Sequence, residues 1–332
     1  MKWGLIGAST IASQFMIDAI RAQNDNIVAS VLSSDQARGS RYAKDHGIAT
    51  AHTDLSALLE QDVDAVYIST TNEKHFPQAM AAIEAGKHVL CEKPLAMSAN
   101  DAVTMVQAAK AAGLTFATNH HLRNAGAHLR IKELITSGRV GTVQAVRVAH
   151  AVYLPAHLQG WRIDNPDAGG GVIPDIVVHD ADTVRFHLDE DPVDVMAIER
   201  TDGLGQGVED SAMSLWRMPS GVMVQTHEGF TIKHAGTSFE VHGTEGSIFA
   251  RNVMTQMPVG QITLRNEAGE QDVPFSTHNL YERAVRLFVA ACAGQGAPSA
   301  TGVDGVKSLA VAAAVKEAAQ TGNRVTVDYG GV

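Results

Sequence analysis

The sequence is poor in cysteine, in basic residues and in long apolar stretches. Its two cysteines, Cys91 and Cys292, cannot build a disulfide framework, so we expect two free, buried thiols. The 26 Lys and Arg are outnumbered by 36 Asp and Glu, which gives a formal net charge of -10. This balance disfavours nucleic acid as a partner, because such binding draws on clustered cations. No apolar run approaches the roughly 18 residues that a membrane helix needs.

The segment MKWGLIGAST leads directly into a strand pattern and has no cleavable small-residue site. We therefore expect a cytoplasmic protein that uses no membrane as a partner. The composition, 45% hydrophobic and 19% charged, is typical of a globular protein with a large core. Because 332 residues exceed what one core usually organises, we expect two domains.

Residues 1–120 alternate short apolar runs with amphipathic segments. Helices are expected from about Ile11, over 37–46 and from His75, between the runs WGLIG, IVASVLS, DAVYIST, HVLC and TFATN. The runs at 27–33 and 64–69 are continuously apolar, as in strands covered on both faces. This order predicts an α/β Rossmann-type domain with a doubly wound parallel sheet.

Residues 121–332 are predicted to form an α+β substrate domain with a large, mostly antiparallel open sheet. From about Thr142 the chain shows strand-like runs separated by turn signals, with a helix near 172–187 and two more near 280–293 and 303–320. In the run SAMSLWRM, apolar side chains fall on both sides, so we expect both faces of this sheet to be covered.

A glycine loop follows the first predicted strand. Gly7 begins the segment GASTIA, where a fingerprint of the type Gly-x-Gly-x-x-Gly/Ala is expected to bring backbone N–H groups to a pyrophosphate. Ser9 stands where the second glycine is usual and adds a hydroxyl, and Ala12 is small enough for helix packing. An ordinary strand-to-helix turn is the alternative, but the repeated βαβ pattern favours a dinucleotide site.

The end of the second strand bears on the choice between NAD and NADP. An acidic side chain there would hold the ribose 2'-hydroxyl of NAD, but this strand ends in Ser33 and Ser34. Two hydroxyls and the nearby Arg38 can donate to a 2'-phosphate, so we expect NADP(H). Asp35 leaves the alternative open, because NAD would be accepted if its carboxylate faced the ribose.

Two segments carry the residue types of a catalytic site. Lys93, within CEKP at the end of a strand, could polarise a carbonyl oxygen or stabilise an alkoxide. Asp175 and His179 lie four residues apart after GGG, at the start of a helix, and could relay a proton. A surface ion pair for Lys93, and a cap with a buried histidine for the other two, remain alternatives. His150 and Tyr153 lie in an apolar strand, so we expect packing roles for them.

The CEKP segment after a dinucleotide-binding half, followed by the glycine-rich Asp-x-x-x-His helix, resembles the Gfo/Idh/MocA oxidoreductase family over essentially the whole chain. The resemblance implies hydride transfer from NADPH to a ketosugar, with His179 as proton donor, Asp175 supporting it and Lys93 near the carbonyl. Segments such as TNHHLRNA and HAVYLPAHLQGWR resemble those of family members that act on 1,5-anhydro-D-fructose, so the resemblance implies reduction of this ketosugar at C2.

The resemblance also implies a set of cofactor-binding residues. They are Ser9, Thr10, Ile11, Ala12, Ser33, Ser34, Arg38, Thr70, Thr71, Asn72, Glu73, Lys74, His75, Glu92, Lys93, Pro94 and Asn119, with Trp161, Arg162 and Tyr281 completing the pocket.

Several alternatives stay open. Another NAD(P)-dependent sugar or polyol dehydrogenase of the family, or a non-catalytic dinucleotide sensor, would use the same fold. A metal-dependent hydrolase or isomerase is disfavoured, because the 15 histidines form no compact ligand cluster in the sequence and Lys93 would repel a metal; we expect no metal site. A homo-oligomer formed through the C-terminal sheet is one possible assembly.

Overall fold

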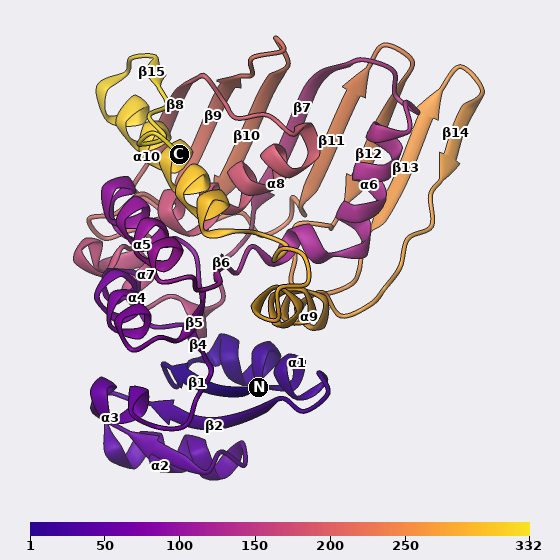
Figure 1. Cartoon of the computed structure of the whole chain (residues 1–332). Helices are drawn as coiled ribbons and strands as arrows, with labels where there is room; N and C mark the ends of the chain where they lie inside the picture. The colour runs from indigo at the N-terminus through magenta and orange to yellow at the C-terminus, as the bar shows by residue number, and fades with distance from the viewer. The chain divides into compact units, whose positions relative to one another are not determined.

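The computed structural model in Figure 1 describes residues 1–332. The chain forms two compact units. The first comprises Met1–His121, Tyr281–Val306 and Val332, and the second comprises Leu122–Leu280 and Lys307–Gly331.

The first unit contains a six-stranded sheet in the order β3-β2-β1-β4-β5-β6. Its strands are β1 (Lys2–Ile6), β2 (Ile27–Leu32), β3 (Thr50–His52), β4 (Ala65–Ile68), β5 (His88–Cys91) and β6 (Phe116–Thr118). Its helices are α1 (Ile17–Arg21), α2 (Gln36–Asp45), α3 (Leu55–Leu59), α4 (His75–Glu84) and α5 (Ala99–Ala111). All pairings are parallel, which confirms the predicted doubly wound sheet. Because the strand order reverses between β1 and β4, the loops after these strands flank the crevice where such sheets bind ligands.

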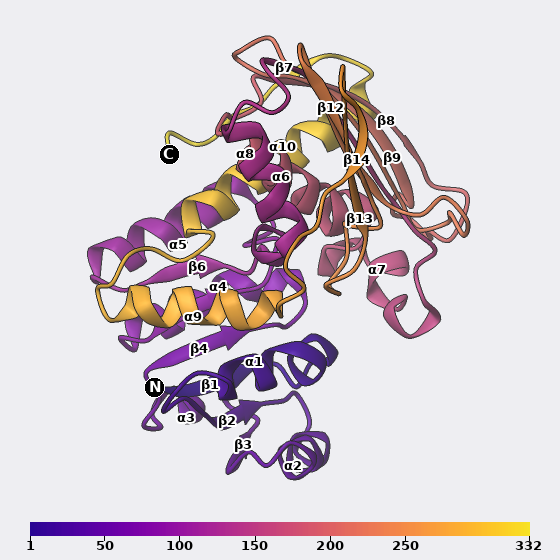
Figure 2. The same ribbon diagram turned by 90° about the vertical axis from the view of Figure 1, so that its right-hand side faces the viewer.

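Helix α9 (Leu280–Cys292) belongs almost entirely to the first unit although it comes late in the chain. The ring centroids of Trp3 and Phe288 lie 5.3 Å apart, and the side chain of Gln23 donates to the carbonyl oxygen of Glu282 at 3.2 Å. Figure 2, like Figure 1, places α9 beside α1. The expected second domain of 121–332 is therefore corrected for 281–306, because the apolar side chains of this helix pack against the N-terminal unit.

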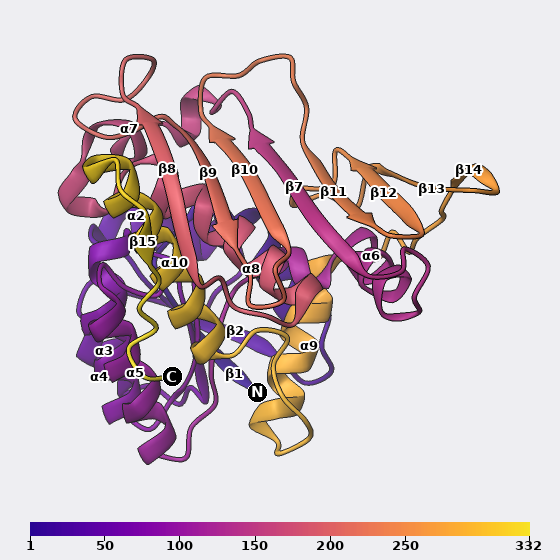
Figure 3. The same ribbon diagram turned by 90° about the horizontal axis from the view of Figure 1, so that it is seen from above.

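The second unit is built on a nine-stranded sheet in the order β14-β13-β12-β11-β7-β10-β9-β8-β15, which Figure 3 shows from above. Its strands are β7 (Val143–Ala151), β8 (Asp194–Arg200), β9 (Ser211–Arg217), β10 (Met223–Gly229), β11 (Ser238–Gly243), β12 (Gly246–Arg251), β13 (Gln261–Asn266), β14 (Gly269–Asp272) and β15 (Val325–Thr326). Only β7 and β10 pair in parallel, so the predicted, mostly antiparallel sheet is confirmed. The helices are α6 (Gly126–Thr136), α7 (Trp161–Asp164), α8 (Val178–Leu188) and α10 (Gly302–Thr321), which belongs to this unit from Lys307 onward.

One face of the nine-stranded sheet carries the core. Helices α6 and α8 lie over it (Figure 1), and buried side chains of the strands, such as Val146 and Trp216, belong to one apolar core with buried side chains of these helices. Each fully buried large apolar side chain contributes about 1.5–3 kcal/mol relative to an exposed one. These burials hold α8, the helix that carries the predicted histidine, against the sheet.

The opposite face of the sheet is open in this chain. Ile198, Met213 and Leu215 are 67%, 44% and 57% exposed, so the expectation that both faces are covered is wrong within the chain. The side chains of β9 alternate regularly between buried and exposed. The polar Ser214 can point into the core because its hydroxyl forms a hydrogen bond with the hydroxyl of Thr226 at 2.6 Å. Association of two copies through the open face stays a prediction.

Tyr153 corrects a second expectation. It is 40% exposed, and the ammonium of Lys233 lies 4.6 Å from its ring centroid, whereas we expected it to be packed in a strand. The reason is that β7 ends at Ala151, so strand alternation no longer determines the direction of this side chain. His150, which is still within β7, is buried as expected.

Both cysteines are free thiols, and the expectation of full burial is met by Cys91, whereas Cys292 is partly buried. None of the helices combines the length and the apolar character needed to cross a bilayer.

Two buried histidines are kept neutral inside the second unit. Nδ1 of His128 lies 3.1 Å from Nε2 of His187, and Nε2 of His128 lies 3.2 Å from the carbonyl oxygen of Val253. A carbonyl only accepts, so Nε2–H of His128 donates to it, and Nδ1 accepts from Nε2–H of His187. Burial lowers the pKa of His128 to about 4 and lowers that of His187 well below its usual range.

This pair makes stability pH-dependent. The unfolded chain takes up a proton on each histidine near pH 6.5, whereas folded His128 does so only near pH 4, so the unfolding free energy, full above 6.5, falls as the pH is lowered toward 4. For one such histidine the loss is about 3 kcal/mol. In urea unfolding between pH 7 and 4, His128→Gln should lose less stability than the wild type over this interval, while the exposed control His234→Gln should follow the wild type. Equal slopes for all three proteins would contradict this prediction.

Candidate active site

The loop after β1 has the shape predicted for a dinucleotide fingerprint. Gly7 has a φ of +118°, and a Cβ there would lie 3.1 Å from the backbone of Ser69 in the loop after β4. Ser9 contacts the same residue, because its Oγ lies 2.7 Å from Oγ of Ser69. Ser9 Oγ also accepts the N–H of Ala12 at 3.2 Å. The serine at the usual glycine position therefore ties together the two loops that flank the crevice and caps the helical turn that begins at Thr10.

The end of β2 places a hydroxyl and a guanidinium near this loop. Ser33 is 4% exposed, whereas Ser34 is exposed. The Arg38 guanidinium donates to the carbonyl oxygen of Ala8 at 2.7 Å, so it reaches the glycine loop. The Asp35 carboxylate accepts the backbone N–H of Arg38 at 2.7 Å and is used as the N-cap of α2.

The segment after β4 forms a turn followed by α4. Thr70 Oγ1 donates to Gln78 at 2.7 Å, and Thr71 Oγ1 donates to Glu73 at 2.7 Å. Residues Asn72–Lys74 form a single 3₁₀ turn in which Asn72 is buried and Lys74 is more exposed. Next, His75 places Nδ1 2.8 Å from the carbonyl oxygen of Pro94, so it ties this segment to the one after β5.

The segment after β5 carries Lys93 beside a buried carboxyl. Glu92 accepts hydrogen bonds from the Tyr67 hydroxyl and, at 2.6 Å, from the Asn119 amide. Burial raises the pKa of Glu92, and these two hydrogen bonds partly offset that rise. The Lys93–Pro94 peptide bond is cis. The ends of β4, β5 and β6 therefore place Tyr67, Glu92 and Asn119 in one hydrogen-bonded group next to Lys93.

Tyr281, the first residue of the returning segment, is 1% exposed. Its ring stacks on that of Phe15 with a centroid distance of 4.8 Å and on that of His121 at 5.4 Å. The structure therefore places this predicted pocket residue inside an aromatic stack of the first unit.

In the second unit, two glycines at the start of the predicted catalytic helix pack closely, one against backbone and one against a carboxylate. A Cβ on Gly170 would lie 2.5 Å from the carbonyl oxygen of Trp161, and one on Gly171 would lie 2.3 Å from Oε1 of Glu209. Glu209 also accepts the N–H of Ile173 at 3.1 Å through the same oxygen. Residues Ile173–Val177 form a π-helical turn before α8, where an α-helix was expected; such turns often occur at functional sites.

Asp175 lies in this π-helical turn and is paired with a cation. Arg162 Nε lies 3.3 Å from Oδ2 of Asp175, and the guanidinium carbon of Arg162 lies 4.6 Å from the ring centroid of Trp161. The structure thus brings together three predicted site residues, Asp175, Arg162 and Trp161.

His179 follows in α8 and is 7% exposed. Its backbone carbonyl accepts the Thr183 hydroxyl at 2.7 Å, and its ring centroid lies 6.1 Å from that of His150. Asp175 and His179 are both nearly buried, which is the setting in which a positioned imidazole can exchange a proton with little competition from bulk water.

The predicted residues fall into two groups, one in each unit. Lys93, Tyr281 and the expected dinucleotide residues up to Asn119 are in the first unit, and Trp161, Arg162, Asp175 and His179 are in the second. Sequence reasoning did not assign roles to Tyr67 or Glu209. The available signal for Tyr67 was an aromatic hydroxyl between aliphatic residues in the run DAVYIST.

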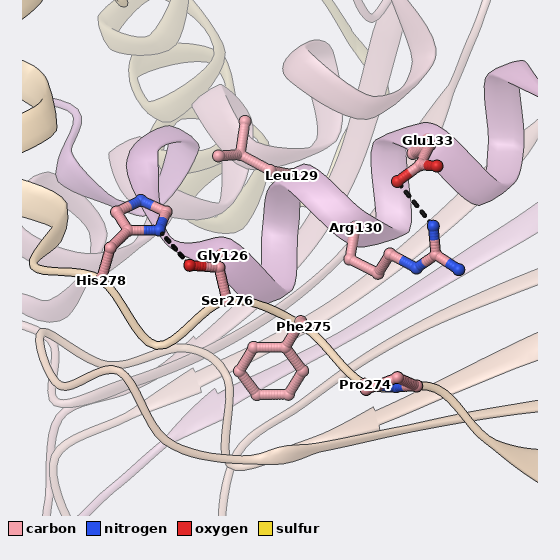
Figure 4. Close-up of a pocket in the computed structure, with 8 residues that line it drawn as sticks. All are labelled: Gly126, Leu129, Arg130, Glu133, Pro274, Phe275, Ser276 and His278. Carbon is pink, nitrogen blue, oxygen red and sulfur yellow. Dashed lines mark hydrogen bonds and ion pairs between the residues drawn. The ribbon is translucent and has the colours of Figure 1, made fainter.

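A hollow of about 460 Å³ lies elsewhere in the second unit and contains none of the predicted residues (Figure 4). It is lined by Gly126, Leu129, Arg130, Glu133, Pro274, Phe275, Ser276 and His278. Its ionisable side chains are paired locally, Arg130 with Glu133 at 2.6 Å and His278 with Ser276 at 2.9 Å. We assign no function to it.

The contact between Gly171 and Glu209 predicts a measurable difference between two glycine substitutions. Gly171 has a φ of +116°, and Gly207 has a φ of +83° with nothing within 4 Å of an added Cβ. Gly207→Ala should therefore cost only backbone strain, about 1 kcal/mol, whereas Gly171→Ala adds the clash with Glu209 and should cost roughly 3 kcal/mol. Thermal unfolding of both variants measures the difference, and equal losses would contradict the proposed role of Glu209.

Comparison with known proteins gives a consistent assignment for both units. The family described as oxidoreductase family, NAD-binding Rossmann fold, matches residues 1–120, and the GFO/IDH/MocA C-terminal domain matches residues 128–249. The chain is 56% identical over 331 residues to 1,5-anhydro-D-fructose reductase of Ensifer adhaerens, covering 99% of each chain. It is 28% identical to D-xylose 1-dehydrogenase (NADP(+)) 2 of Haloferax volcanii, covering 99% of this chain and 100% of that one.

The fold is shared with a solved structure of lower identity. Aldose-aldose oxidoreductase from Caulobacter crescentus, complexed with glycerol, superimposes with a TM-score of 0.90 at 24% identity, covering 98% of this chain and 99% of the other. The predicted fold class and family resemblance are both confirmed. The parallel sheet with its glycine loop, the open antiparallel sheet and the two family matches together establish that the chain belongs to the GFO/IDH/MocA family of oxidoreductases.

Proposed function

We propose that this protein reduces the C2 carbonyl of 1,5-anhydro-D-fructose to give 1,5-anhydro-D-mannitol, with NADPH as hydride donor. The observation that carries the proposal is the 56% identity, over 99% of both chains, to the Ensifer adhaerens reductase. The residue types required for carbonyl reduction, Lys93, Asp175 and His179, are all present in this chain.

The residues around β1 and β2 fit a dinucleotide with a 2'-phosphate. The close approach of Gly7 to Ser69 leaves no room for a Cβ, as a tight phosphate-binding turn requires. At the end of β2, Asp35 caps its own helix while Arg38 reaches the glycine loop, an arrangement that favours NADPH over NADH. When bound, NADPH supplies the hydride.

The side chains then have distinct tasks. The Lys93 ammonium stabilises the negative charge that develops on the carbonyl oxygen. His179 gives the proton that forms the new O–H bond, and its own N–H bond breaks in the same step. Asp175, held by its ion pair with Arg162, lies in the helical turn that precedes His179 and supports the position of the imidazole.

A second candidate is oxidation of an aldose, as the name of the Haloferax volcanii relative indicates for that protein. The two functions use the same nicotinamide chemistry in opposite directions. The two functions are distinguished by whether a ketosugar or an aldose supports turnover.

The proposed reaction is tested by following NADPH oxidation with a panel of ketosugars that includes 1,5-anhydro-D-fructose, alongside NADP⁺ reduction with aldoses. We expect turnover with 1,5-anhydro-D-fructose. His179→Ala should lose about 10² to 10⁴ in kcat, the usual contribution of general acid catalysis, and still bind NADPH in a fluorescence titration. The exposed control His234→Ala should keep wild-type kcat. Wild-type kcat in His179→Ala, or no turnover with any ketosugar, would refute the proposal.

Cofactor preference gives a separate prediction. Ser33→Asp introduces a carboxylate where the 2'-phosphate of NADPH is expected, and repulsion should lower kcat/KM for NADPH by at least about tenfold, equivalent to roughly 1.4 kcal/mol. Ser33→Ala, which removes only the hydroxyl, serves as the uncharged control and should lose less. An unchanged ratio of kcat/KM for NADPH and NADH in Ser33→Asp would count against NADPH at this position.

A further inference from the structure

Near His179, the second unit contains three ionisable side chains that the proposed chemistry does not use. They are His150 on β7, Asp180 on α8 and Glu228 on β10, and they are 8%, 0% and 0% exposed. β7 and β10 pair in parallel with Glu228 opposite His150, so both side chains emerge on the inner face of the sheet beneath α8. Burying two carboxyls and an imidazole in one place is costly unless protons and hydrogen bonds compensate.

Two contacts centre on His150. Its Nδ1 lies 2.7 Å from Oδ1 of Asp180, and its ring centroid lies 6.1 Å from that of His179. A carboxylate at Nδ1 fixes the imidazole with its proton on that nitrogen. His150 is therefore held by Asp180 and lies beside His179, the candidate proton donor.

The two carboxyls cannot both be ionised. Burial raises the pKa of Glu228 well above its usual range, and the charge of Asp180 raises it further. Burial also raises the pKa of Asp180 well above its usual range. Because Asp180 also has an N–H donor in His150, the ionised form is better stabilised at Asp180, and Glu228 keeps the proton.

The surrounding charges leave this one negative charge uncancelled. From the π-helical turn, Asp175 is paired with Arg162 of α7, so those two charges compensate each other. From α6, His128 interacts electrostatically with His150, and burial keeps it neutral by lowering its pKa to about 4. Asp180 itself contacts the His150 imidazole and forms no ion pair with a lysine or an arginine.

We propose that His150, Asp180 and Glu228 are positioning residues for His179: Glu228 holds one proton, Asp180 keeps one negative charge, and that charge stabilises protonated His179. In a protein interior that excludes water, the Asp180 charge acts on the nearby His179 imidazole much more strongly than it would in water. The proposal rests on the proposed function in so far as it takes His179 to be the proton donor.

The test compares two proteins that differ only in that charge. Glu228→Gln replaces one neutral group with another, so the titration midpoint of His179 should stay within about 0.3 pH units of wild type. Asp180→Asn added to Glu228→Gln removes the charge and should lower this midpoint by about one pH unit, equivalent to a tenfold smaller protonated fraction above the midpoint. Asp189→Asn added to Glu228→Gln is the matched control, because Asp189 ends the same helix but is exposed and paired with Lys132.

The midpoint is read from the imidazole NMR signal of His179, assigned with His179→Gln, and the pH profile of kcat should move in parallel. A midpoint unchanged by removing Asp180 overturns the proposal. So does a midpoint that already falls in Glu228→Gln, because the charge would then reside on Glu228.

Infrared spectroscopy tests whether Glu228 holds a proton and does not need the Asp180 variant. The proposal therefore stays falsifiable if that variant does not fold. The wild type at pH 7 should show the C=O stretch of a buried carboxylic acid, and Glu228→Gln should lose it. Absence of this band in the wild type overturns the proposal. Failure of every ketosugar as a substrate would refute the proposed function, but the NMR and infrared results would still decide the charge arrangement.

Discussion

The packing of Glu209 against the glycine segment is the constraint on which the candidate site residues of the second unit depend. Its carboxylate occupies the space that a Cβ on Gly171 would need and accepts the N–H of Ile173, so a side chain from the loop before β9 fixes the first turn of the helix. Burial raises the pKa of Glu209, and the backbone donor helps to hold the charged form. The direction of α8, and with it the positions of Asp175 and His179, follows from this contact.

A comparable constraint organises the first unit. The loops after β1 and β4 belong to neighbouring strands at the point where the strand order reverses, and they touch through Gly7, Ser9 and Ser69. A serine replaces a usual glycine without opening the turn, because its hydroxyl is used within the protein. Two local hydrogen bonds of the Ser9 hydroxyl thus compensate for the larger side chain in the loop.

Much of the fold could be predicted from the sequence because its signals are local. Continuous apolar runs marked β2 and β4, and turn signals separated the strands of the second sheet. The short elements β3 and α3 carry too few residues for a periodic signal. The placement of 281–306 with the first unit could not be predicted, because the sequence shows that α9 is amphipathic but not which surface it packs against.

For the candidate site, the sequence by itself determined which residue types are present, Lys93 after a strand and Asp175 with His179 on one helical segment, and to which family the chain belongs. It did not determine their partners. The pairing of Arg162 with Asp175 depends on strand register and on how α8 lies on the sheet. The same holds for the cluster of His150, Asp180 and Glu228. Proton positions in such a group are decided by burial and by neighbouring charges, and only the tertiary structure brings those together.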